Sequence, residues 1–212
     1  MESHHLSARI TRSGLAFFAL LAWPAAAHAH LASTGFGPFY DGLTHLILSP
    51  DDLLGIAAMA LLAGSLSARH GRWVLFVLPV TWLLGGGFGL ALRQEIHLDA
   101  WNAASILIIG ALVAANWRLP LPLVAGLALA LGGLHGFLNG SGLGTSTNAL
   151  LALAGIACGC FVLVALVAAC AVKLHATRAR IVVRVTGSWI AAIGLLMLGW
   201  AFRAGVAPDG LP

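Results

Sequence analysis

The sequence predicts an all-α integral membrane protein with a bundle of six transmembrane helices. Three observations lead to this fold class: composition, the pattern of the apolar runs, and length. Hydrophobic residues make up 60% of the 212-residue chain and charged residues 8%, whereas about a quarter of the residues in soluble domains are charged. The apolar runs are continuous and do not alternate, which argues against a transmembrane β-barrel. A third observation is length, because the chain has room for about six helices of ~20 residues.

The first 27 residues have the pattern of a secretory signal peptide. Arg9 and Arg12 precede a short apolar run over residues 14–23, and alanines at 25–27 are typical of a cleavage site. The alternative is an uncleaved anchor helix, but a run of about ten residues is too short to span a bilayer comfortably. We therefore expect cleavage after Ala27.

Six apolar segments follow an outer-face segment over residues 28–50. Polar breaks separate them, and tryptophans such as Trp73 and Trp200 fall near their ends, where amphipathic rings favour the membrane interface. The domain organisation is thus a signal peptide (1–27), the outer-face segment with a half-helix (28–50) and a six-helix transmembrane domain (51–212). We expect the spans at about 51–68, 73–92, 100–117, 119–138, 148–172 and 181–202.

The basic residues predict the orientation, because cytoplasmic loops carry an excess of Lys and Arg. On one side lie only Arg93 and Arg203. The other side holds seven such residues, in the loops after the first, third and fifth spans and at the start of the sixth: Arg69, Arg72, Arg118, Lys173, Arg178, Arg180 and Arg184. We therefore expect a multi-pass protein of the bacterial inner membrane with both mature termini in the periplasm.

This orientation gathers the acidic residues of the mature chain on the outer face. Such a face can concentrate cations, although the same pattern results if cytoplasmic loops merely lack acids. The acids are Asp41, Asp51, Asp52, Glu95, Asp99 and Asp209, and the histidines predicted on the same side are His28, His30, His45, His97 and His135.

The stretch from Thr34 to Leu54 combines helix-breaking residues with acids and an imidazole. A re-entrant or interfacial half-helix over residues 42–48 is expected, because glycine and proline precede it and Ser49-Pro50 ends it. If it is helical, Asp41 and His45 share a face, and a carboxylate with an imidazole could hold a divalent transition metal. The alternative is that Asp41 caps the half-helix and His45 bonds a neighbouring helix.

Two further groups of polar residues are secondary metal candidates. Asp51 and Asp52 are expected mainly as water-facing residues at the N-terminus of the first span, where the helix dipole favours a negative charge. His97 alternates with Glu95 and Asp99 in an outer loop, for which a solvated loop is the simpler interpretation.

His135 ends the fourth predicted span in the sequence GGLHGFLNG, with Asn139 four residues later. Neighbouring glycines, including Gly136, allow another helix to approach closely. Ionisable groups within spans are costly and are candidate functional residues. The alternative is an interhelical hydrogen bond. His135 and His45 are expected at similar depth, which favours a joint site.

The predicted mature N-terminus offers a separate metal site. If cleavage follows Ala27, the chain begins with His28 and has His30 at its third position. An α-amine, two deprotonated amides and an imidazole then provide four nitrogens in a plane, which suits Ni(II) or Cu(II). The alternative is a disordered N-terminus with two incidental histidines.

The segments GFGPFYDGLTHLILSPDDLL and HGFLNG, with the signal-plus-six-span layout, resemble the HupE/UreJ family of hydrogenase and urease accessory membrane proteins. Many members are regarded as permeases for nickel, or for nickel and cobalt. Members usually carry a signature of the form H-P-x-x-G-x-D-H, to which Gly42 and His45 correspond. Thr44 stands where the acid is expected and Pro38 where the first histidine is expected, and Asp41 could supply the missing carboxylate.

The family's second signature, a histidine followed by glycine, matches His135-Gly136. The resemblance implies an inner-membrane permease for a divalent metal, with Ni²⁺ first and Co²⁺, Cu²⁺ or Zn²⁺ as alternatives, serving urease or hydrogenase maturation. We expect no enzyme activity and no nucleic-acid partner; the bilayer, the ion, a second copy of the chain or maturation proteins are the expected partners. The alternatives are a non-transporting metal-binding accessory protein and a membrane metalloenzyme.

Overall fold

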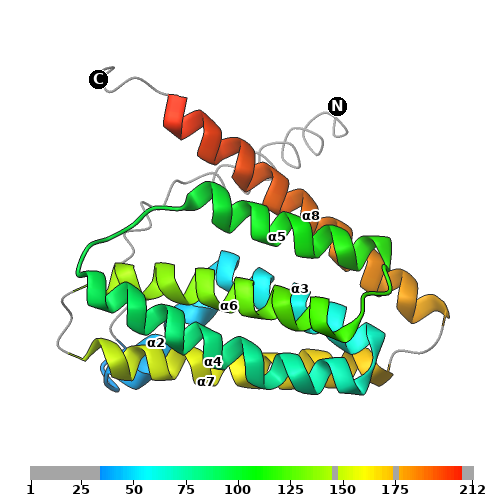
Figure 1. Cartoon of the computed structure of the whole chain (residues 1–212), viewed down its shortest axis with the longest axis horizontal. Coiled ribbons are helices and arrows are strands. Elements are labelled where there is room, and N and C mark those ends of the chain that lie inside the picture. The colour runs from blue at the N-terminus through cyan, green and yellow to red at the C-terminus, as the bar shows by residue number, and fades with distance from the viewer. Residues whose placement is uncertain (1–33, 145–147, 174–176, 207–212) are drawn as a thin grey trace, which may run out of the picture. The chain divides into compact units, whose positions relative to one another are not determined.

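The structure is a computed structural model that describes residues 34–144, 148–173 and 177–206. Within these ranges the secondary structure is helical, which confirms the all-α prediction (Figure 1). The predicted signal peptide and the two histidines of the predicted mature N-terminus, His28 and His30, lie outside the described residues. The helices are α2 (Pro38–Leu48), α3 (Pro50–Leu66), α4 (Ala68–Leu92), α5 (Asp99–Ala115), α6 (Leu121–Leu143), α7 (Ala149–Lys173) and α8 (Thr177–Val206).

The half-helix is longer than predicted and begins earlier. Gly35 and Gly37 have φ values of 77° and 104°, which glycine adopts without steric cost, so the chain does break there. Pro38, however, does not belong to the break, because it is the first residue of α2. Its fixed φ suits the first helical turn, where its missing N–H costs no hydrogen bond.

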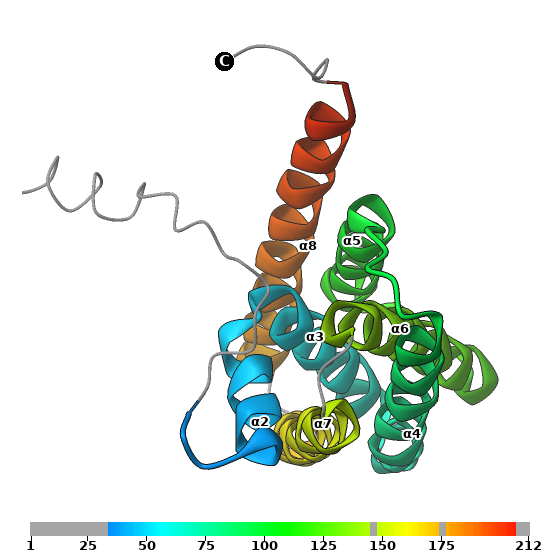
Figure 2. The ribbon, with the colours of Figure 1, turned by 90° about the vertical axis from the view of Figure 1, so that its left-hand side faces the viewer.

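Helices α2 and α3 meet at Ser49 with a bend of 77°. Ser49 has extended backbone dihedrals, and its side chain makes no capping hydrogen bond. Helix α2 then packs against α7, as Figure 2 shows. Gly42 makes this contact possible, because a Cβ at this position would collide with the backbone carbonyl of Ala152.

Helix α4 packs along α6 through glycines on both helices. A Cβ at Gly136 would collide with the backbone carbonyl of Trp82, and one at Gly140 with that of Gly86. Small residues let helix backbones approach closely, which is how helices associate in membranes. The predicted close-packing role of Gly136 is therefore confirmed.

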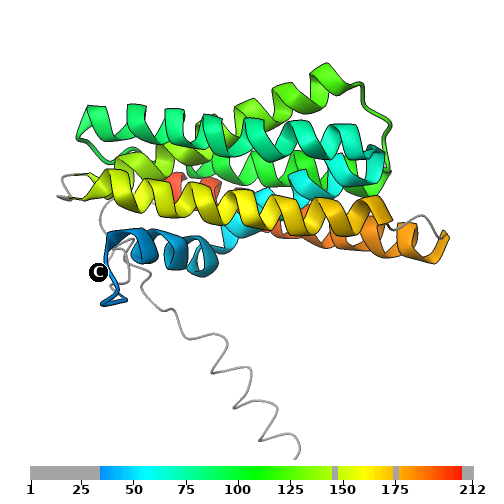
Figure 3. The same cartoon turned by 90° about the horizontal axis from the view of Figure 1, so that it is seen from below.

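The remaining helices complete the bundle around α3. Helix α5 lies along α8, where a Cβ at Gly110 would be 2.6 Å from the backbone nitrogen of Ala191. Helix α7 contacts α2, α3 and α4, as Figure 3 shows from below. Ile56, Met59 and Leu62 of α3 are fully or almost fully buried, so one face of α3 forms much of the core.

Among the residues that the structure describes, four helices could span a membrane, or five if the bent pair is counted. Helices α4, α6, α7 and the Arg180–Arg203 part of α8 are long and apolar enough to cross a membrane. Helices α2 and α3 meet the same criterion together, as one bent pair. Helix α5 is apolar but has 17 residues, so the sixth span stays a prediction.

Candidate functional site

Three helices bring a set of polar side chains together inside the bundle. We call Asp51, Asp52, Asn102, Ser105, His135 and Asn139 the buried polar cluster. Asp52 and His135 are 3% and 1% exposed, and they come from α3 and α6. Asn102 and Ser105 come from α5. Because ionisable groups are costly within a bundle of membrane helices, such a cluster is a candidate functional site.

Local sequence explains why these helices can meet at polar groups. Asp51 and Asp52 stand in the first turn of α3, where the helix dipole favours carboxylates. One turn further on, Gly55 leaves space for the imidazole, since a Cβ there would be 3.3 Å from His135 Cε1. Trp82 also lies near the imidazole, with 5.5 Å between the ring centroids.

The Asp52 carboxylate links His135 and Asn139 to α3. His135 Nδ1 is 2.8 Å from Asp52 Oδ1, and Asn139 Nδ2 donates to Asp52 Oδ2 at 2.9 Å. Asn139 Nδ2 is also 2.9 Å from the backbone oxygen of His135. Both carboxylate oxygens therefore have a partner, as a buried carboxylate requires.

The second imidazole nitrogen faces α5. His135 Nε2 is 3.0 Å from Ser105 Oγ, and that hydroxyl is 2.7 Å from the backbone oxygen of Asn102. If the imidazole is neutral with its proton on Nδ1, Ser105 donates its single proton to Nε2. If the imidazole is protonated, Nε2 donates to Ser105, which then donates to Asn102. The geometry thus accommodates two proton arrangements.

This arrangement fits the way proteins present a histidine to a metal. Metal-binding histidines almost always donate their other ring N–H to a carboxylate or carbonyl, which orients the ring. Asp52 provides this partner for Nδ1 of His135, so Nε2 is the nitrogen that could take an ion. The side-chain oxygens of Asn102 and Asn139 are buried without a hydrogen-bond partner and are additional oxygen donors in the cluster.

The cluster does not present many strong metal ligands at one point. Across residues 34–144, 148–173 and 177–206, no group of three or more His, Cys, Asp or Glu side chains could hold a metal ion. Asp51 lies beside the His135 group and accepts from Asn102 Nδ2 at 2.7 Å. The cluster therefore offers one imidazole, two carboxylates that already accept hydrogen bonds, and neutral hydroxyl and amide oxygens.

The predicted water-facing position is wrong for Asp52, whereas Asp51 is partly exposed. Asp52 is buried, and both carboxylates bond to side chains of other helices. The first turn of α3 bonds to side chains of α5 and α6, so the Asp52 carboxylate is enclosed by the bundle. Ionisable groups within spans are costly. This argument, which makes His135 a candidate functional residue, applies equally to Asp52.

The residues predicted as the first metal site lie in different places. Asp41 accepts hydrogen bonds from the backbone nitrogen of Thr34 at 2.6 Å and from its hydroxyl at 2.7 Å. His45 Nε2 is 3.3 Å from Ser49 Oγ. Both residues are on α2, which packs against α7, whereas His135 bonds to residues of α3 and α5. Asn139, by contrast, does lie with His135.

The outer-loop candidate His97 is exposed. It precedes α5, in a segment where Glu95 and Asp99 are exposed as well. Gly42 and Gly136, which the resemblance singled out, both permit close helix contacts next to functional candidates. Gly42 lies between Asp41 and His45 in sequence, and Gly136 follows His135.

Comparison with known proteins identifies the family. The family model described as HupE / UreJ protein matches residues 16–197, most of the chain. The chain belongs to this family. Protein HupE of Rhizobium leguminosarum bv. viciae is 28% identical over 184 residues, which cover 85% of this chain and 94% of that protein. No solved structure matches the chain.

Membership in the HupE/UreJ family agrees with the membrane helices seen in the structure. The match spans residues of α2 through α8 and includes the whole buried polar cluster. This chain is therefore a multi-pass membrane protein of a family of accessory and transport proteins. Its His135-Gly136 pair provides the imidazole at the centre of the cluster.

Proposed function

We propose that this HupE/UreJ protein is an inner-membrane permease for a divalent transition metal, with nickel as the first candidate, serving urease or hydrogenase maturation. The family is associated with nickel and cobalt uptake for these enzymes. One observation carries the proposal to particular residues: an imidazole, oriented by a buried carboxylate, lies where three helices of the bundle meet.

In this proposal, the ion passes the cluster along Nε2 of His135. The outer-face residues Asp41 and His45 capture the ion first, and the cluster receives it inside the bundle. A permeation site must bind an ion strongly enough to admit it and weakly enough to release it. One imidazole with neutral oxygens and carboxylates that are already hydrogen-bonded meets that requirement better than a closed set of three or four charged ligands would.

Imidazole and carboxyl donors suit nickel, cobalt, copper and zinc alike, so donor type does not select among them. Nickel is the first candidate because of the family association. The comparison metals in any uptake experiment are therefore Co²⁺ and Zn²⁺, each tested as a competitor of labelled Ni²⁺.

The test is uptake of labelled Ni²⁺ at low concentration by cells that express the full chain. His135→Ala removes the imidazole that would bind the ion. Loss of a residue that only orients a metal ligand lowers metal affinity or activity about 10–100-fold. Loss of the ligand itself should therefore lower uptake by at least that factor. His70→Ala is the matched control, because His70 bonds to Ser67 at the start of α4, outside the cluster. Normal uptake by His135→Ala, at normal protein levels, contradicts the site.

Flux distinguishes a permease from a binding protein. Purified wild-type chain in liposomes should admit Ni²⁺, and the His135→Ala protein should not. Metal binding to the purified chain without flux would instead support the accessory-protein function, in which the same residues deliver or sense metal at the outer face.

A further inference from the structure

Two shallow cavities flank Arg72 at the end of the bundle where α4 begins. The first, of about 430 Å³, is lined by Arg69, Arg72, Trp73, Phe76 and Val77. The second, of about 340 Å³, lies between α4 and α7 and is lined by Arg72, Lys173 and small or aliphatic side chains. Arg72 borders both cavities, and the metal proposal uses neither.

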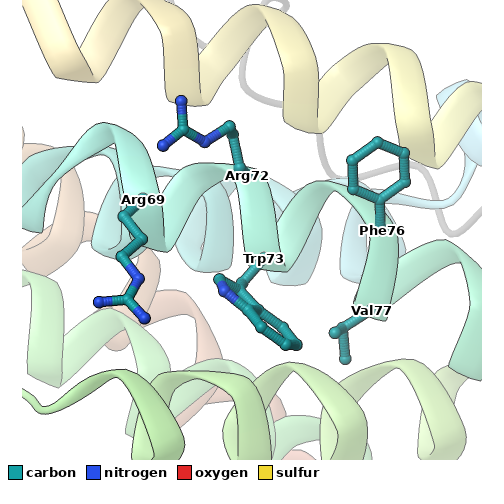
Figure 4. A pocket seen from close by; sticks show the side chains of 5 residues that line it. All are labelled: Arg69, Arg72, Trp73, Phe76 and Val77. Carbon is teal, nitrogen blue, oxygen red and sulfur yellow. The ribbon is translucent and has the colours of Figure 1, made fainter.

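The side chains around Arg72 alternate along α4. Figure 4 shows Arg69, Trp73 and Val77 on one flank of the helix, with Arg72 and Phe76 on the other. Both flanks therefore have a guanidinium group at the helix start and apolar groups further along. On α7, Phe161 packs near Phe76, with 5.9 Å between their centroids.

The three cations at this end are Arg69, Arg72 and Lys173. They have no acidic residue near them in the sequence. The sequence has no Asp or Glu between residues 53 and 94, nor between 100 and 208. Within the described ranges, the ion pair found within 4.0 Å is His135–Asp52. Arg69 and Arg72 are exposed, so their charges are available to an anion from outside the protein.

We propose that this surface binds one anionic phospholipid. The headgroup phosphate pairs with Arg72, flanked by Arg69 and Lys173, and the two acyl chains follow the apolar cavities on either side of Arg72. A guanidinium pairs with phosphate through parallel hydrogen bonds, and basic pockets at the ends of membrane helices bind lipid headgroups. A soluble phosphate would use the cations but leave both apolar cavities empty.

The position of the site along α4 fits a lipid. Helix α4 is long and apolar enough to cross a membrane, and both arginines are in its first turns. Trp73, half-exposed next to Arg72, has the amphipathic character that favours the interface between headgroups and chains. The phosphate would therefore lie at headgroup depth and the chains along the apolar part of α4.

Native mass spectrometry of the full chain, purified in detergent, tests the proposal. The protein is titrated with phosphatidylglycerol and phosphatidylcholine of the same acyl chains. Each cation near an anionic lipid contributes roughly fivefold in affinity, so Arg69→Gln with Arg72→Gln should weaken phosphatidylglycerol binding about 25-fold. Phosphatidylcholine has the same phosphate, but its choline cation offsets the charge, so its binding should weaken less. Arg69→Lys with Arg72→Lys should retain most of the preference.

Arg118→Gln is the matched control, because Arg118 is also exposed and lies in the loop before α6. A loss of phosphatidylglycerol by this variant equal to that of Arg72→Gln alone would overturn the proposal in favour of a diffuse basic surface. Unchanged binding by the double glutamine variant would overturn it as well.

A second measurement separates the lipid from a free phosphate. Ala169 lines the cavity between α4 and α7 and is exposed, so Ala169→Phe should fill that cavity and weaken phosphatidylglycerol binding with all cations in place. Glycerol 3-phosphate should not displace the lipid. Displacement by glycerol 3-phosphate, or unchanged binding by Ala169→Phe, would contradict the role of the acyl-chain cavities.

Discussion

At the scale of single residues, Asp52 is the group that organises the candidate site. Its two oxygens hold His135 Nδ1 and Asn139 Nδ2, at 2.8 and 2.9 Å. If either partner is removed, one buried oxygen of the carboxylate has no hydrogen bond, which is costly. The charge of Asp52 therefore matters to an ion at His135 even though the ion would bind the opposite nitrogen.

Asp52→Asn should separate the function of this group from its structural role. The new amide can still accept from His135 with its oxygen, and the Asn139 amide can rotate to accept from its nitrogen. The fold should therefore persist, while loss of the negative charge behind His135 should lower nickel uptake about 10–100-fold. Labelled uptake and a thermal unfolding curve measure the two effects.

Asp99→Asn is the control for this prediction, because Asp99 is exposed in the first turn of α5. Asp52→Leu should behave differently from Asp52→Asn. It leaves His135 and Asn139 without their acceptor, which costs about 1–3 kcal/mol for each buried group, so its unfolding temperature should fall. Wild-type uptake by Asp52→Asn would exclude the charge from the transport mechanism.

At the scale of helices, the sequence predicts the features that depend on the local pattern of residues. Apolar length predicted the helices, and the glycines before and after His135 predicted close packing. The bend between α2 and α3 was expected near Ser49-Pro50, but its direction depends on how α2 docks on α7 through Gly42. Nothing local to Asp52 shows that His135, 83 residues away, is its partner.

The same limit explains why the sequence alone groups Asp41 and His45 with His135. Their spacing on one helix was visible in the sequence, and a similar depth in the membrane followed from topology. Depth does not specify which helices are neighbours. The structure pairs α2 with α7 and places α3 and α5 around His135, so Asp52 occupies the place that the prediction gave to Asp41.

Gly136→Ala should separate α4 from α6 next to His135. Its Cβ would collide with the carbonyl of Trp82, and forcing a methyl group into a packed contact costs about 1–3 kcal/mol. Gly133→Ala is a matched control on the same helix, since its Cβ meets nothing within 4 Å. Thermal unfolding in detergent should show a lower midpoint for Gly136→Ala alone. Equal midpoints would contradict the close α4–α6 contact.

At the scale of the whole molecule, the number of membrane crossings depends on α5. Its 17 residues rise about 26 Å, slightly less than the ~30 Å hydrocarbon core of a bilayer. Helix α5 lies along α8, a candidate span. If α5 crosses, the loops before and after it lie on opposite sides, and the positive-inside bias puts Arg118 in the cytoplasm.

Thiol labelling decides whether α5 crosses the membrane. In a chain whose own cysteines, at 158, 160 and 170, are replaced by alanine, a single cysteine is introduced by Gln94→Cys or by Arg118→Cys. Both positions are exposed, so a difference in labelling reports sidedness and not burial. With six spans, a membrane-impermeant maleimide should label the Gln94→Cys protein in spheroplasts, and the Arg118→Cys protein only after permeabilisation. Labelling of both proteins from outside would mean that α5 stays on one side of the membrane, and the basic residues at 69, 72 and 118 could then not all face the cytoplasm.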